Sequence, residues 1–248
     1  MGCGGYRHQI ANLNGSYMKT VSIVAQGRSF ASYIQDCTDK GGVPPTDEVW
    51  TVNAMGGVIK HDLLFHMDDC RVQESRPNRN IHRMMGWLKD HPKFMTSTAY
   101  PEYPGAVEYP LEEVVNCIGV PYLNGTVAYA VAYAIYKEYD GIRLYGADFT
   151  YSHVHKAERG RGCVEFLLGV AMSRGIALHL PKYTTLMDTC EPWNIKMYGY
   201  DAWDIDWDVT EEGLVLKKQP KPLPPGEAIE ELYLTKEKQN AQAMGIAT

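Results

Sequence analysis

Short apolar segments alternate with longer helical ones along this chain, and the alternation constrains the fold more than any other feature. The first example is Val21–Cys37, where a buried strand runs through Gly27 and Ser29 into a helix. Glycine permits a tight turn there, and serine is a residue type that caps a helix. The repeated order predicts an α/β fold, a Rossmann-like and mostly parallel sheet with helices on both faces.

The other predicted elements follow from the same patterns. Strands are expected at 48–53, 62–66, 94–96, 142–146 and 176–180, and helices at 30–37, 81–90, 126–139 and 163–174. The segment 96–121 predicts an ordered irregular loop, and 217–225 an extended linker before a helix at 227–244. We therefore expect an N-terminal extension (1–19), a Rossmann-like catalytic domain (20–190) and a C-terminal extension (191–248).

Composition sets limits on function. The 248 residues are 45% hydrophobic, which suits one large core. No apolar run is long enough for a membrane span and no signal peptide is evident, so a cytoplasmic protein with reduced cysteines is expected. The net charge of −6 argues against broad contact with a phosphate backbone, so nucleic acid is expected only as a substrate.

Ligands of parallel sheets gather at the carboxyl ends of the strands. The residues that follow the predicted strands include Gln26–Ser29, Asn53, His66–Asp69 and Ala147–Tyr151. The start of the first helix, with Gln26–Ser29, is a candidate phosphate site because backbone N–H groups and the helix dipole favour an anion. Asp68 and Asp69 are candidate Mg²⁺ ligands, or else a capping pair for the next helix.

Four segments, taken in order, resemble the sialyltransferases of glycosyltransferase family 42. They are the strand–turn–helix of Val21–Cys37, the strand end TVNAM (Thr51–Met55), the block Leu123–Tyr151 with its Gly-Ala-Asp-Phe end, and His155–Pro181. The resemblance extends over most of 21–188. The same core resembles the MptE-like proteins, which include 6-hydroxymethylpterin pyrophosphokinases.

The resemblance implies a group transferase that uses a nucleotide-activated donor linked to CMP, UDP or GDP. His155 would be the general base, with His153 as its competitor, and Asp148 would lie against the sugar or base. The residues implied in donor binding are Gln26, Gly27, Arg28, Ser29, Asn53, Asn124, Gly125, Thr126 and Tyr151. Lys156, Arg159 and Arg161 flank the histidine and are suited to neutralise developing negative charge.

Two alternatives stay open at this stage. Because only six residues lead from Phe149 to His155, the long sialyltransferase lid is mostly missing, and a shorter pyrophosphokinase-like enzyme fits as well. That enzyme would transfer from ATP to a hydroxymethyl group with Mg²⁺ on Asp68 or Asp69. The other alternative is a nucleotide-binding module without chemistry. The acceptor stays unknown, a homo-oligomer stays open, and the small size suggests a phage-encoded protein acting in the host cytoplasm.

Overall fold

The computed structural model describes residues 18–150, 153–190, 197–200, 202–210, 213–223, 225–228 and 230. Two compact units divide the chain, Met1–Cys190 and Glu191–Thr248, and each is described by itself. Tyr151, most of the predicted N-terminal extension and nearly all of the predicted helix at 227–244 lie outside the described residues. Within the described part, no helix has both the length and the apolar character needed to cross a membrane.

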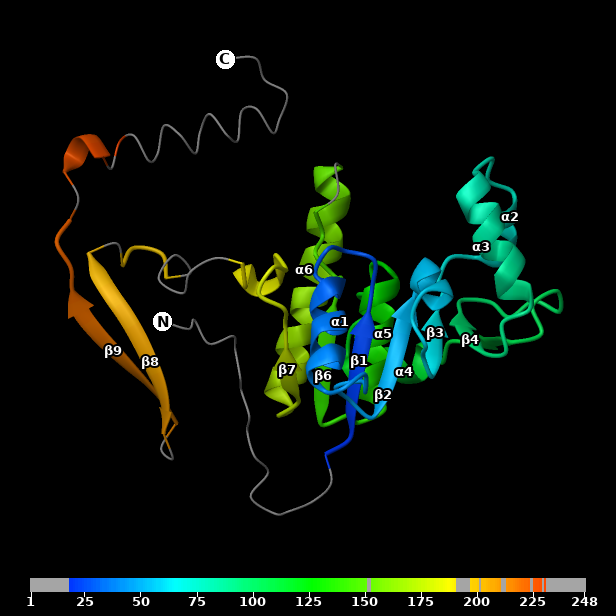
Figure 1. Ribbon diagram of the computed structural model, residues 1–248, viewed down its shortest axis with the longest axis horizontal. Coiled ribbons are helices and arrows are strands. Elements are labelled where there is room, and N and C mark those ends of the chain that lie inside the picture. Colours follow the sequence, from blue (N-terminus) through cyan, green and yellow to red (C-terminus); the bar gives the residue numbers. More distant parts are fainter. Residues whose placement is uncertain are drawn as a thin grey trace. The chain divides into compact units, whose positions relative to one another are not determined.

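Seven parallel strands form the sheet of the first unit, in the order β5-β4-β3-β2-β1-β6-β7 (Figure 1). The strands are β1 (Thr20–Val24), β2 (Glu48–Val52), β3 (Leu63–Phe65), β4 (Phe94–Thr96), β5 (Ala106–Glu108), β6 (Gly141–Tyr145) and β7 (Ala177–His179). From β1 the chain steps outward to β5, and it then returns to the other side of β1 to form β6. The strand order therefore reverses between β1 and β6, where α/β sheets place their ligands.

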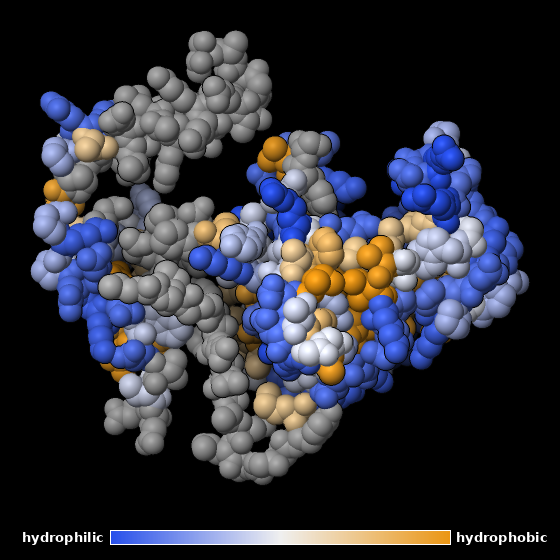
Figure 2. Space-filling model, viewed as in Figure 1, coloured by the Kyte–Doolittle hydropathy of each residue, from blue (hydrophilic) through white to orange (hydrophobic). Residues whose placement is uncertain are grey.

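Helices cover both faces, so the predicted Rossmann-like α/β fold is confirmed. The helices are α1 (Phe30–Asp39), the 3₁₀ helix η1 (Asn53–Gly57), α2 (Cys70–Glu74), α3 (Arg79–Lys89), α4 (Leu111–Ile118), α5 (Thr126–Tyr136), α6 (Val154–Ser173) and the 3₁₀ helix η2 (Leu186–Asp188). The helices α4, α5 and α6 pack on one face, and α1, η1, α2 and α3 pack on the other. In Figure 2 the edge formed by α2 and α3 is largely hydrophilic, in agreement with the exposed polar residues of α3.

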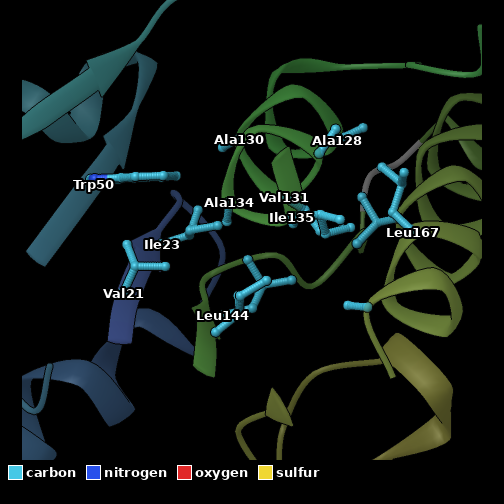
Figure 3. Close-up of a cluster of buried hydrophobic side chains, with 14 of the residues drawn as sticks. Val21, Ile23, Trp50, Ala128, Ala130, Val131, Ala134, Ile135, Leu144 and Leu167 are labelled. Carbon is cyan, nitrogen blue, oxygen red and sulfur yellow. The ribbon is translucent and has the colours of Figure 1, made fainter. Parts of the chain in front are cut away.

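Alternation along the strands divides the core between the two faces. Val21 and Ile23 point toward α5, whereas Val24 points toward α1. Figure 3 shows Val21, Ile23 and Trp50 beside Ala134 of α5. Small alanines on this helix allow it to lie close to the sheet, and the ring of Trp50 is 1% exposed. Replacing such a buried ring by alanine typically costs about 3–5 kcal/mol.

Several predicted elements differ from the observed ones. The segment 96–121 was expected to be irregular, but it contains β5 and α4, because its apolar side chains, such as Val114, reach the core. The helix predicted at 163–174 begins much earlier, at Val154, so His155 lies in the first turn of α6 and not in a preceding loop. Within this earlier part of the helix, Gly160 allows close packing against Phe149.

The described part of the second unit contains an antiparallel hairpin of β8 (Trp203–Thr210) and β9 (Gly213–Pro220). The first half of the predicted linker at 217–225 therefore belongs to a strand. Cross-strand pairing explains this, because Lys217 lies opposite Asp206 and also forms an ion pair with Asp208.

Candidate functional site

A cleft of about 920 Å³ opens at the carboxyl ends of β1, β2 and β6, beside the N-termini of α5 and α6. This is the position where the strand order reverses. Most predicted site residues line it: Gln26, Gly27, Arg28, Asn53, Asp68, Asn124, Gly125, Thr126, Asp148, His153 and His155. Segments about 130 residues apart in the sequence are thus brought to one cavity.

Ser29 is buried and does not line the cavity. Its backbone N–H and its hydroxyl form hydrogen bonds with other residues of the protein. Its backbone N–H donates to Asp148 Oδ2 at 2.7 Å, and its hydroxyl donates to Asp148 Oδ1. The same hydroxyl accepts from the Gly146 N–H at 2.8 Å. A carboxylate of the protein thus occupies the start of α1, where the sequence predicted a phosphate, and Ser29 does not cap α1 with its side chain.

The β1 and β6 turns approach each other very closely. The Gly27 N–H donates to the Gly146 carbonyl at 2.7 Å. A Cβ added at Gly27 would lie 2.6 Å from both Asp148 Oδ2 and the Gly146 carbonyl oxygen, so only glycine fits this position. The predicted contact of Asp148 with a sugar or base stays a prediction, but its two oxygens already hold the first turn in place.

The start of α5 remains available to an anion. Gly125 is its N-cap residue, with φ of +120°, and no side chain caps the helix. Thr126 and Val127 line the cavity, so the first N–H groups of the helix border it. Asn124 is held in place, since its N–H donates to the Cys163 Sγ at 3.2 Å and its Nδ2 to the Arg159 carbonyl at 3.3 Å. This helix start is the better candidate phosphate site.

The first turns of α6 bring basic groups to the same cavity. His153 is the N-cap residue, and its Nδ1 accepts from the Lys156 N–H at 3.4 Å. His155 is largely exposed, and its Nδ1 lies 3.6 Å from Glu158 Oε2. Lys156 and Arg159 also line the cavity, whereas Arg161 pairs with Glu165 and Asp188. The arrangement brings two histidines, a lysine and an arginine near the start of α5.

The cavity floor rests on packing that the sequence did not reveal. Phe149 has φ of +51°, and its ring lies against Gly160 of α6, where an added Cβ would be 2.7 Å from Phe149 Cε1. Thr184 donates to the Ala147 carbonyl at 3.0 Å, and Thr185 to the Asp148 carbonyl at 2.6 Å. The two threonines anchor the loop that carries the site.

The two aspartates predicted as Mg²⁺ ligands lie in different environments. Asp68 lines the cavity. Asp69 does not: it caps α2 by accepting from the Val72 N–H at 2.9 Å, and it accepts from the Tyr100 hydroxyl at 2.6 Å. The bond from Tyr100 lowers the pKa of Asp69. The capping alternative thus describes Asp69, and among the described residues no group of three His, Cys, Asp or Glu side chains is arranged to hold a metal ion.

The end of β2 contributes a polar residue with an unusual backbone conformation. Asn53 has φ of +52°, a left-handed conformation that non-glycine residues adopt rarely and often at functional sites. Its Oδ1 lies 3.0 Å from Nδ1 of His66, which follows β3 and is buried. Burial lowers the pKa of His66, so its ring is neutral near pH 7.

Comparison with known proteins shows a fold likeness at low identity. No family model matches the chain, and no curated protein matches it. The sialyltransferase CstII from Campylobacter jejuni, in complex with the substrate analogue CMP-3FNeuAc, is similar with 15% identity and a TM-score of 0.45, over 87% of this chain and 99% of that one. The CST-II structure with a trisaccharide acceptor and CMP gives 13% identity, the same coverage and a TM-score of 0.43. At these values the likeness carries no information about activity.

Proposed function

We propose that this protein is a glycosyltransferase-like group transferase that binds a nucleotide-activated donor in the cleft between β1, β2, β6 and α6. The observation that carries the proposal is the uncapped start of α5, which borders a cavity also lined by Lys156 and Arg159. Backbone N–H groups, a helix dipole and two cations together favour a phosphate group over a neutral ligand. The volume of about 920 Å³ is ample for a nucleotide sugar.

His155 is the general base in this proposal. It would take the proton of the acceptor hydroxyl as the acceptor oxygen bonds to the anomeric carbon and the bond from that carbon to the donor phosphate breaks. The released phosphate keeps the electron pair of that bond, and the start of α5 with Arg159 stabilises its charge. Glu158, 3.6 Å from His155, stabilises the imidazolium that forms. His153 has the different task of capping α6.

The placement of the aspartates favours glycosyl transfer over the Mg²⁺-ATP alternative. Asp69 accepts hydrogen bonds from Val72 and Tyr100, and Asp148 accepts them from Ser29. Among the described residues, Asp68 is the carboxylate of the cavity wall that accepts no hydrogen bond from the protein. A magnesium-dependent pyrophosphoryl transfer needs a more developed set of oxygen ligands. We therefore expect donor binding without a divalent cation.

Isothermal titration with CMP, UDP, GDP and ATP, each with EDTA and with Mg²⁺, tests the binding site. Binding of a nucleotide in EDTA supports the proposal, strict dependence on Mg²⁺-ATP supports the pyrophosphokinase, and absence of binding in all eight titrations contradicts both. With the preferred nucleotide, hydrolysis or transfer of its sugar derivatives is then measured for His155→Ala and for the exposed control His82→Ala. Removal of the base should lower kcat by about 10²–10⁴-fold with unchanged nucleotide affinity, whereas full activity of His155→Ala would remove this residue from the chemistry.

A further inference from the structure

His66 is a buried histidine that the proposed chemistry does not use. Its side chain follows β3 and is 1% exposed, and its Nε2 has no hydrogen-bond partner among the described residues. Most buried polar atoms in proteins are paired, and an exception calls for an explanation. The residue does not line the cavity, so a direct contact with a ligand is not the explanation.

The other ring nitrogen of His66, Nδ1, suggests an explanation for the unpaired Nε2. His66 Nδ1 lies 3.0 Å from Asn53 Oδ1. An amide oxygen can only accept, so this contact requires the proton on Nδ1 and leaves Nε2 as an unpaired acceptor. The opposite arrangement, with the amide turned over, would bury an unpaired N–H group at Nε2, which is rarer in proteins than an unpaired acceptor. The Nδ1–H tautomer is therefore the one that the surroundings favour.

This bond has a consequence for the cavity. An asparagine free to turn its amide can offer a ligand either its oxygen or its amino group. Asn53 lines the cavity, and its Oδ1 is engaged by His66, so Nδ2 is the group left to face a ligand.

We propose that His66 is a positioning residue that locks the Asn53 amide, so that the cavity offers a hydrogen-bond donor at the end of β2. The inference rests on the proposed nucleotide site and specifies it: the ligand atom at this point is an acceptor, such as a base carbonyl or an unprotonated ring nitrogen. A base that carries a proton at the same place is disfavoured, because two donors would face each other.

Two variants of His66 distinguish a role in fixing the Asn53 amide from a role in packing alone. Asparagine at position 66 places a donor near the site of Nδ1, whereas glutamine places one near the site of Nε2. We expect His66→Asn to bind like the wild type and His66→Gln to lose about tenfold in affinity for the preferred nucleotide. The ribonucleoside 5′-monophosphates of the four bases are the probes. His66→Gln should also reduce the ratio of affinities between the monophosphate that binds most tightly and the one that binds most weakly. Equal binding by His66→Gln and the wild type, or equal losses in both folded variants, would overturn the proposal.

A second measurement does not depend on nucleotide binding. Nitrogen NMR of the wild-type protein distinguishes the two tautomers of His66, with His66→Asn identifying the signal. The Nδ1–H tautomer supports the lock, and the Nε2–H tautomer overturns it. If the wild type binds neither these monophosphates nor UDP, GDP and ATP, the proposed nucleotide site fails, while the tautomer still decides how Asn53 is held.

Discussion

Asp148 and Ser29, 119 positions apart in the sequence, are joined by two hydrogen bonds at the start of α1. The carboxylate lies where the helix dipole and free N–H groups would otherwise attract a ligand anion. The turn after β1 is thereby bound to the turn after β6, and the start of α5, which no side chain caps, becomes the candidate phosphate site.

This relationship predicts a stability loss for Ser29→Ala. The substitution removes the hydroxyl that donates to Asp148, and it leaves the Gly146 N–H without its acceptor. We expect the free energy of unfolding to fall by about 1–3 kcal/mol in urea titrations. Ser173→Ala, which removes an exposed hydroxyl from the end of α6, should stay within about 0.5 kcal/mol of the wild type. Equal effects of the two substitutions would contradict the assignment.

The contact of Phe149 with α6 predicts opposite effects for two glycines of one helix. Gly160→Ala places a Cβ 2.7 Å from the ring, so we expect a loss of about 1–3 kcal/mol in unfolding free energy and weaker nucleotide binding. Gly169→Ala meets no atom within 4 Å and should stabilise the helix by up to about 1 kcal/mol. Thermal unfolding and calorimetry check both, and a stabilised Gly160→Ala protein would show that the ring is not held there.

The cations at the start of α6 predict a phosphate-dependent loss of affinity. Arg159→Ala removes a charge that lines the cavity, and we expect about tenfold weaker binding of a nucleotide, the equivalent of about 1.4 kcal/mol. Binding of the matching nucleoside, which lacks phosphate, should change little. Arg83→Ala removes the same charge from an exposed position on α3 and serves as the control. If nucleoside and nucleotide lose affinity equally, Arg159 does not face the phosphate.

One buried and one half-buried histidine, His66 and His91, predict that acid destabilises the fold. Burial lowers the pKa of His66 and of His91, whose Nε2 also lies 3.0 Å from Nε2 of His61. Because each binds a proton less readily in the folded than in the unfolded chain, their contribution is complete above about pH 6.5 and is lost as the pH falls below that value.

Urea unfolding at pH 7.5, 6.5 and 5.5 measures this slope. We expect a lower unfolding free energy at pH 5.5, and a shallower slope for His91→Phe. A wild-type stability that rises on acidification would contradict the prediction.

Much of the architecture could be predicted because it depends on local patterns of apolar and turn-forming residues. The apolar and small residues of Val21–Ala25 predicted a short buried strand, and the helix at Thr126 followed from its apolar composition and the glycine before it. The carboxyl ends of strands located most of the cavity, since parallel strands end on one edge. By contrast, β5 and α4 were missed, because a segment rich in proline and tyrosine is typical of a loop. Their contacts with the core become evident only in the tertiary structure.

The sequence by itself determined the alternation of strands and helices over most of the sheet and the small set of turns able to form a site. Only the tertiary structure decided which of those turns an anion can reach. Ser29 is engaged by Asp148, Asp69 by Tyr100, and Asn53 by His66, through hydrogen bonds between segments far apart in the chain. The physical reason is that periodicity reports burial within one element, whereas the partner of a polar group depends on which elements the sheet brings together.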